Sequence, residues 1–246
     1  MDWTDQGIVL ARRRHGESAA VVSLLTREHG RHAGLVRGGA GKRAGSLYQP
    51  GNLLAAHWRA RLSEHLGTLT TELVDAFASR VLDDALRLSA LTSACALLET
   101  ALPEREPHTP LFDATLDLLR ALASAAGNTE WGSAYARWEI EALAELGFGL
   151  DLAACAATGQ REDLAYVSPR TGRAVSGGAG AAYADRLFAL PAFLSTADQA
   201  ADAAEVAAAL RLTGHFLERH VFGPHNRRLP AARTRFIERW RRLVRE

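Results

Sequence analysis

The chain has 246 residues and a formal net charge of +1, and 48% of its residues are hydrophobic. No apolar run reaches the roughly 18 residues of a membrane-spanning helix. The first residues are acidic and lack the basic and apolar segments of a signal peptide, and two cysteines are too few for a disulfide framework. We therefore expect a cytoplasmic protein of one or two domains.

The charge is distributed unevenly along the chain. Residues 1–80 carry 11 Lys and Arg against 7 Asp and Glu, a net +4, whereas residues 81–210 carry 8 against 18, a net −10. Residues 211–246 carry 10 against 3, a net +7. Two basic ends around an acidic middle indicate a polyanionic partner, although solvated helix faces explain the C-terminal part equally well.

The first 80 residues are predicted to form strands. Short apolar segments separated by glycine and proline turns predict strands at 6–14, 19–26, 31–36, 52–59 and 67–74. Five short strands in so short a stretch favour a small β-barrel of the OB type, the barrel that binds oligonucleotides. We expect residues 1–80 to form a separate domain of this kind.

The remaining residues, 81–246, are predicted to be mainly helical. Apolar residues at helical spacing indicate helices at 83–102, 109–126, 131–146, 200–220 and 231–244. Thr109 followed by Pro110 is typical of a helix N-cap and first helical position. Residues 148–183, rich in Gly, Ser and Ala, are expected to form an irregular insertion. The predicted fold class is therefore α+β, with an N-terminal barrel and a C-terminal helical domain.

A basic, glycine-rich segment, residues 34–45, follows the third predicted strand and contains Lys42, the only lysine of the chain. A nucleotide-binding P-loop requires Gly, four residues, and then Gly-Lys-Ser/Thr. Val36 stands where the first glycine is required, and Arg43 stands where the hydroxyl residue is required. Glycines and a proline in residues 44–51 also oppose a following helix. The segment is therefore predicted to be a flexible basic loop that meets the phosphates of a polyanion.

Further basic residues stand near the ends of the predicted strands. Arg12, Arg13 and Arg14 end the first strand, where alternation places Arg13 on the opposite face from the other two. A half-buried strand does not bury three arginines, so this end is expected to meet water or anions. Trp58 either stacks on a base or packs in the core. The predicted DNA-contacting set is Arg12, Arg13, Arg14, Arg37, Lys42, Arg43, Trp58, Arg59 and Arg61.

No arrangement in the sequence indicates an enzyme or a metal site. No Cys or Ser is accompanied by a His and an acid in a known local signature. Cys95 lies on an apolar face of a predicted helix and is expected in the core. Cys155 matches the first ligand of a zinc ribbon, but Thr158 stands at the second position and no later cysteine follows. We therefore expect no catalytic residue, no metal and no cofactor.

Several segments, in their order and spacing, resemble the RecO family of bacterial recombination mediators over nearly the whole chain. In the strand-rich part they are GIVL at 7–10, HGES at 15–18, LTREHG at 25–30, VRGG at 36–39 and LYQPG at 47–51. Further along, FGLD at 148–151, Cys155, YVSP at 166–169 and Gly172 resemble the family's ribbon-like insertion. The resemblance implies an OB fold that binds DNA, then a helical domain, and no hydrolysis.

The resemblance also implies a task and partners. Members of the family bind single- and double-stranded DNA, anneal complementary strands, and help to load RecA onto DNA covered by single-stranded-DNA-binding protein (SSB). The implied partners are DNA, the C-terminal tail of SSB, RecR and, indirectly, RecA, with a cytoplasmic, nucleoid-associated location. Some members hold zinc with four cysteines in the insertion, of which only Cys155 remains here. We therefore expect a zinc-less insertion folded around Phe148, Leu150, Leu152 and Tyr166.

A second hypothesis is a protein-interaction scaffold in which DNA binding is secondary. The acidic helical middle then binds a partner protein, and an acidic, apolar SSB tail requires an apolar pocket edged by arginine. Arg120, Arg137 or the C-terminal arginines are candidates for that edge. A nuclease is a more distant possibility, because the acidic residues of the basic domain are dispersed among its strands.

Overall fold

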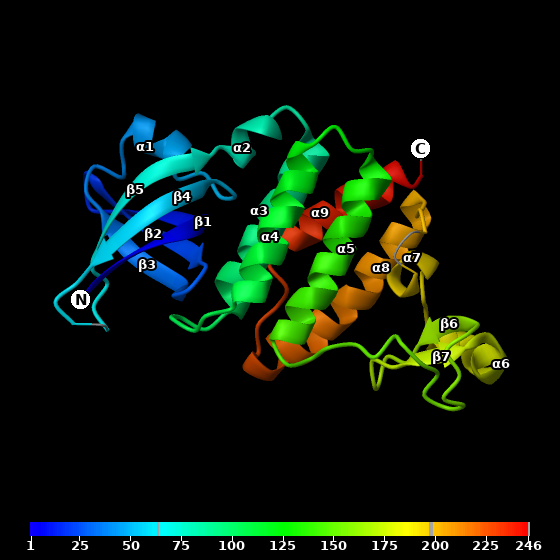
Figure 1. Ribbon diagram of the computed structural model, residues 1–246. Coiled ribbons are helices and arrows are strands. Elements are labelled where there is room, and N and C mark those ends of the chain that lie inside the picture. Colours follow the sequence, from blue (N-terminus) through cyan, green and yellow to red (C-terminus); the bar gives the residue numbers. More distant parts are fainter. Residues whose placement is uncertain (63, 197–198, 246) are drawn as a thin grey trace. The chain divides into compact units, whose positions relative to one another are not determined.

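The computed structural model describes residues 1–62, 64–196 and 199–245 (Figure 1). The chain divides into two compact units, one formed by Met1–Ser124 with Pro230–Phe236, the other by Ala125–Leu229 with Ile237–Glu246. The first unit contains the β-barrel and the helices that directly follow it. Among the described helices, none combines the length and the apolar character that crossing a membrane requires.

Five strands close into a barrel in the order β1-β2-β3-β5-β4. This confirms the predicted α+β class with an OB-type barrel at the N-terminus. The strands are β1 (Asp2–His15), β2 (Ala19–Thr26), β3 (Gly30–Val36), β4 (Leu53–Arg59) and β5 (Thr68–Asp75). All neighbours are antiparallel except β3 and β5, which run parallel and share one residue pair, Leu35 with Thr68.

Strand β1 is longer than predicted because it pairs with two strands, β4 and β2. Its first half pairs with β4 from Asp2 to Ile8, and its second half pairs with β2 from Gly7 to His15. The register with β2 shifts between Val9 and Ala11, a bulge of the kind that bends a strand around a small barrel. Alternate residues then point inward, and the core consists of Val9, Val22, Leu24, Val36, Tyr48, Leu54, Ala56, Trp58 and Leu69.

A short helix, α1 (Lys42–Leu47), follows the third strand. The prediction of a flexible loop without a helix was therefore wrong at this place. Gly45 disfavours a helix intrinsically, but tertiary contacts outweigh that preference. The Asn52 side-chain amide donates to the last carbonyls of α1, those of Ser46 and Leu47, at 2.9 and 3.0 Å. Tyr48, directly after α1, is buried in the barrel core.

The first unit also contains α2 (Phe77–Arg80), α3 (Ala85–Ala101) and α4 (Thr109–Ala123). Asp84 caps α3, as its carboxylate accepts from the N–H groups of Leu86 and Arg87. The N-cap of α4 is His108, so the predicted cap Thr109 is already the first helical residue. Cys95 is buried, as expected, and burial raises the pKa of its thiol to about 12.

The second unit is built on α5 (Asn128–Glu145) and α8 (Ala203–Phe216), which pack against each other. Helix α8 continues as a π-helical turn over Leu217–Phe222, and α7 (Ala192–Ser195) precedes it. The last helix, α9 (Ala231–Leu243), contributes residues to both units. Within the second unit the rings of Trp131 and Trp240 meet edge to face, with centroids 5.2 Å apart.

The insertion is more regular than predicted. The strands β6 (Leu164–Val167), β7 (Ala174–Ser176) and β8 (Phe188–Ala189) form a sheet in the order β7-β6-β8. A short helix, α6 (Gly177–Gly180), and a 3₁₀ helix over Ala181–Arg186 lie between β7 and β8. The sequence did not indicate these strands because each spans only two to four residues, too few to show a periodicity.

The residues expected at the centre of the insertion are not those that the fold buries. Phe148 is 39% exposed, and its ring stacks on His220 instead. Among the described residues of the insertion, the buried side chains are instead Cys155, Val167 of β6, and Ala174 and Ser176 of β7, with the Ser176 N–H against the Cys155 sulfur. In the parts of the chain that are described, no three His, Cys, Asp or Glu side chains gather as a metal site.

Candidate nucleic-acid interface

The barrel register brings predicted cationic residues together at the ends of β1 and β3. Arg14, Ala20 and Val36 form one row across β1, β2 and β3. Arg37 follows Val36 in the chain and therefore lies near the end of β1. The glycine-rich turn is fixed at the same place, because the N–H of Ala40 donates to the carbonyl of Ser18 at 3.0 Å.

Helix α1 begins from this turn and adds Lys42 to the group. Gly45 lies against Arg12: a Cβ at this glycine would stand 3.2 Å from a guanidinium nitrogen of Arg12. That nitrogen is buried and makes no hydrogen bond with a described residue. Arg43 belongs to α1, and its side chain lies outside what the structure describes.

A second basic group stands at the end of β4. Arg59 of β4 pairs with Thr68 of β5, and Thr68 pairs with Leu35 of β3, so the three residues form one row across these strands. Arg61 follows two residues after Arg59. A cavity of about 430 Å³, which we call the seam cavity, is lined by the end of β3 with Arg37, by Tyr48 and by the start of β5. The seam cavity follows the junction of β3 and β5. Arg37 lies on its β3 side. Arg59 belongs to β4, the strand on the other side of β5, where it pairs with Thr68.

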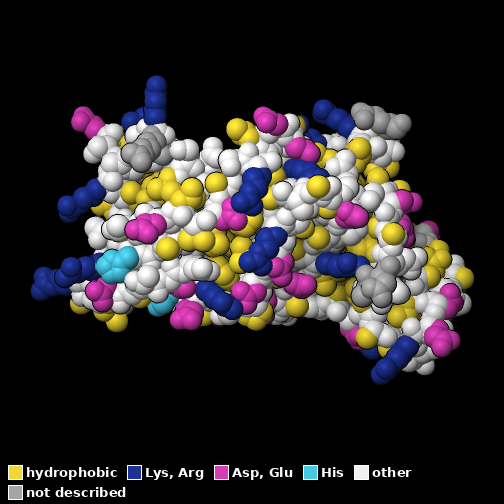
Figure 2. Space-filling model, turned by 45° about the horizontal axis from the view of Figure 1, so that its top comes forward, with side chains coloured by type: hydrophobic (Ala, Val, Ile, Leu, Met, Phe, Trp, Pro, Cys, Tyr) yellow, Lys and Arg dark blue, Asp and Glu magenta, His cyan; other side chains and the backbone are white. Residues whose placement is uncertain are grey.

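Within the described part of the chain, the two basic groups have no ion-pair partners. The side chains of Arg14, Arg37, Lys42, Arg59 and Arg61 are exposed and form no ion pair with a described residue. Figure 2 shows Lys and Arg side chains projecting from the barrel, at the left of the view. Uncompensated cations on one part of a surface raise the local concentration of anions, so this part of the barrel suits phosphates. We call these five residues the cationic surface.

Arg13 lies apart from this surface, on the opposite face of β1, as strand alternation predicts. Its guanidinium is 3.2 Å from the carboxylate of Glu99 on α3. The same carboxylate accepts a hydrogen bond from the Ser23 hydroxyl at 2.6 Å and lies 3.8 Å from Arg31. Arg13 therefore takes part in the contact between the barrel and α3, whereas Arg12 and Arg14 form no ion pair with a described residue.

Trp58 belongs to the core, so the interpretation as a base-stacking residue is corrected in favour of packing. The side chain is 2% exposed, and its ring stacks on that of Trp3 at 5.7 Å and meets that of His32 in an edge contact at 4.7 Å. Its indole N–H donates to the carbonyl of Leu66 at 2.9 Å. Because the ring is buried and its donor is used, it has no surface left for a base.

His32 is a barrel residue that the sequence did not single out. It is buried and makes edge contacts with the rings of Trp3 and Trp58, and neither ring nitrogen has a hydrogen-bond partner in the described structure. Burial, aided by the nearby charge of Arg105, lowers the pKa of His32 to about 4. The ring is therefore neutral at physiological pH and packs as an aromatic residue. Only its position on the inner face of β3 distinguishes it from the exposed histidines.

Cys155 is likewise defined by its surroundings in the fold. It is buried beside Ser176, whose N–H lies 3.2 Å from the sulfur. Hydrogen bonds from the Ser176 hydroxyl, the Thr158 hydroxyl and the Ser176 N–H lower the pKa of this thiol to about 6. Thr158, which stands where a zinc ribbon has its second cysteine, thus stabilises the thiolate of the first.

The barrel, its cationic surface and the helices that follow define the class of OB-type proteins with an appended helical region. Two family models match the chain: "Recombination protein O N terminal" over residues 1–77 and "Recombination protein O C terminal" over residues 82–229. The chain belongs to the RecO family, whose members are DNA repair proteins.

Individual relatives match nearly end to end. The DNA repair protein RecO of Rhodospirillum rubrum is 56% identical over 245 residues, which cover 98% of this chain and 97% of the relative. That of Rhodospirillum centenum is 57% identical over 98% of this chain and 96% of its own length. A Cereibacter sphaeroides relative of the same name is 49% identical, with 97% and 98% covered.

Proposed function

We propose that the protein binds single- and double-stranded DNA without reading its sequence, and that the barrel provides the binding surface. The observation that carries this proposal is the cationic surface, whose charges have no ion-pair partner among the described residues. Phosphate contacts fix a protein on nucleic acid and carry no sequence information by themselves. Arg12 and Arg43 are included because they adjoin this surface in β1 and α1, whereas Arg13 is left out because it pairs with Glu99.

We further propose that the protein anneals complementary strands and helps to load a recombinase onto SSB-coated DNA. Annealing requires no bond-making chemistry, since a cationic surface that neutralises two phosphate backbones lets base pairing proceed. Membership of the RecO family supports this assignment, and no catalytic group is needed for it. The proposed partners are DNA, the SSB tail, RecR and, indirectly, RecA, in a cytoplasmic protein associated with the nucleoid.

Binding is tested by fluorescence anisotropy of the full-length protein with a labelled single strand and with a duplex over a series of salt concentrations. We expect affinity to fall steeply with salt, and Arg37→Ala/Arg59→Ala to lower the slope by about two, roughly one per lost phosphate contact. Arg120→Ala is the matched control, because Arg120 is an exposed arginine on α4 that pairs with Asp117. An unchanged affinity and slope in the double variant would show that the cationic surface does not bind DNA.

Annealing and partner binding are tested separately. The rate at which two complementary labelled strands anneal is measured with and without SSB, and binding of the SSB tail peptide is measured directly. We expect the protein to accelerate annealing of free strands and of SSB-coated strands. Binding of the peptide without any binding of DNA would instead support the scaffold hypothesis.

A further inference from the structure

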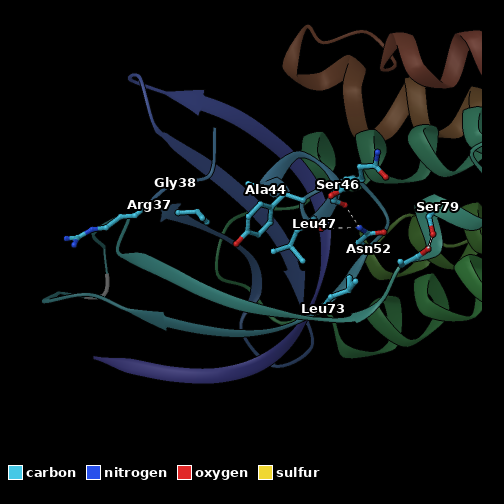
Figure 3. A pocket seen from close by; sticks show the side chains of 12 residues that line it. Arg37, Gly38, Ala44, Ser46, Leu47, Asn52, Leu73 and Ser79 are labelled. Carbon is cyan, nitrogen blue, oxygen red and sulfur yellow. Dashed lines mark hydrogen bonds between the residues drawn. The ribbon is translucent and has the colours of Figure 1, made fainter. Parts of the chain in front are cut away.

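A cavity of about 630 Å³ lies between α1, the end of β3 and the end of β5 (Figure 3). We call it the helix cavity. It shares Val36, Arg37 and Tyr48 with the seam cavity, so the two adjoin and together form one groove along β5. In Figure 3 the side chain of Arg37 extends away from the other lining residues, toward the outside of the barrel.

The walls of the helix cavity are largely aliphatic. Leu47 from α1 and Leu73 from β5 lie on its opposite sides, and Val36 and Ala44 extend the apolar lining. Leu73 is 50% exposed even though it points to a cavity. A half-exposed apolar side chain that lines a cavity gives a ligand with flat apolar faces a surface to cover, because covering it removes apolar area from water.

Polar groups accompany this apolar lining. The side-chain amide of Gln49 lines the cavity and makes no hydrogen bond with a described residue. The outer edge of β5 is also open, because among the described residues β3 and β5 share a single ladder pair, Leu35 with Thr68. From Thr70 to Val74, β5 has no strand partner on that side within the described chain. The groove therefore offers amide and main-chain donors and acceptors beside an apolar surface.

The chemistry of this groove fits an unpaired nucleic-acid base. A base has apolar faces and a hydrogen-bonding edge, and in a duplex both are covered by stacking and pairing. The aromatic platforms on which single-strand binders stack bases are buried here, since Trp58 and Tyr48 are 2% and 5% exposed. A single strand held at Arg37 and Arg59 passes the mouth of the groove, where aliphatic side chains take the place of an aromatic platform.

We infer that the helix cavity accepts an unpaired base of single-stranded DNA, between Leu47 and Leu73, and that the protein therefore prefers single strands to duplex. This inference rests on the proposed DNA binding and adds to the cationic surface a site that only unpaired bases can occupy. A neutral peptide is a less suitable occupant, because it would leave the cations on both flanks of the groove without anionic partners, and an acidic peptide such as the SSB tail is distinguished from a base by the test below.

The test compares three labelled probes of equal length, about 20 nucleotides: oligothymidine, the same backbone without bases, and a duplex. For the full-length protein we expect oligothymidine to bind roughly tenfold more tightly than the abasic strand. Leu73→Ser should abolish that difference and leave duplex affinity unchanged. Val74→Ser is the control, because Val74 is equally exposed, at 50%, but does not line the cavity.

The outcomes separate this inference from the proposed function. If oligothymidine and the abasic strand bind alike, or if Leu73→Ser weakens all three probes equally, the base site is refuted while DNA binding stands. If none of the probes binds, the proposed function fails and this inference fails with it. If Leu73→Ser abolishes binding of the SSB tail peptide and spares oligothymidine, the cavity serves a protein partner and the base site is overturned.

Discussion

The guanidinium of Arg13 pairs with Glu99 at 3.2 Å, whereas Arg14, the next residue of β1, has no ion-pair partner among the described residues. Two neighbouring arginines of the same strand thus face different surroundings: one faces α3, the other faces water next to the β3 turn. Alternation along the strand separates them, and this difference provides a matched pair of variants.

Arg14→Ala should weaken DNA binding several-fold, because a phosphate contact is lost, and should leave stability unchanged. Arg13→Ala should do the opposite: DNA affinity stays the same and the free energy of unfolding falls by no more than about 1 kcal/mol, the usual contribution of an exposed ion pair. Anisotropy with a labelled strand and urea unfolding measure the two effects. Equal losses of DNA affinity in both variants would refute this division.

Asn52→Ala should destabilise the barrel strongly. The Asn52 amide donates to two carbonyls of α1, and its oxygen accepts from the N–H of Ala78 at 3.2 Å. The side chain is buried, so its removal leaves these groups without partners, at a cost of about 2–4 kcal/mol. Urea unfolding gives the loss directly. Gln49→Ala, next to α1, is the control and should change stability by less than about 0.5 kcal/mol.

Gly132→Ala should destabilise the second unit, because the glycine allows Trp240 to approach α5. A Cβ at residue 132 would lie 2.2 Å from the Trp240 ring, and the ring is fully buried, so it cannot move aside. Such overpacking typically costs about 1–3 kcal/mol. Thermal unfolding of Gly132→Ala should show a clearly lower midpoint. Gly178→Ala, where a Cβ meets no atom within 4 Å, should leave it unchanged.

Protonation of His32 should make stability dependent on pH. Its pKa is about 4 in the folded barrel against 6.5 for the unperturbed side chain, so the unfolded chain binds the proton more readily. The stabilising effect of the neutral ring is complete above pH 6.5 and is lost as pH falls from there toward 4. Linkage gives a loss of about 3 kcal/mol over this range.

The measurement is the free energy of unfolding between pH 7.5 and 4.5, compared with that of His32→Phe, whose aromatic ring keeps the packing but does not titrate. The wild-type protein should lose more stability than the variant over this interval. Replacement of the exposed His225 by Phe is the control and should preserve the wild-type profile. If the free energy of unfolding changed with pH in the same way for the wild type and for His32→Phe, the lowered pKa of His32 would be contradicted.

Much of this molecule can be predicted from local patterns. The alternation in Ala19–Thr26 and Leu53–Arg59, and the helical spacing in Ala85–Ala101, match the observed elements closely because each is long enough to show its period. The boundary between two domains near residue 80 stays a prediction. The short elements were not predicted. Helix α1 has only six residues and contains a glycine, and β6, β7 and β8 are too short to show a period.

The candidate site could be recognised only from the sequence and the tertiary structure together. Sequence by itself determined the basic residues, the OB-type barrel and membership of the RecO family, because these follow from composition, periodicity and motifs along the chain. Only the tertiary structure decided which of the predicted arginines form no ion pair with a described residue, that Trp58 is buried, and that Leu47 and Leu73 line one cavity. Each of these depends on contacts between residues far apart in the chain, and no local pattern encodes them.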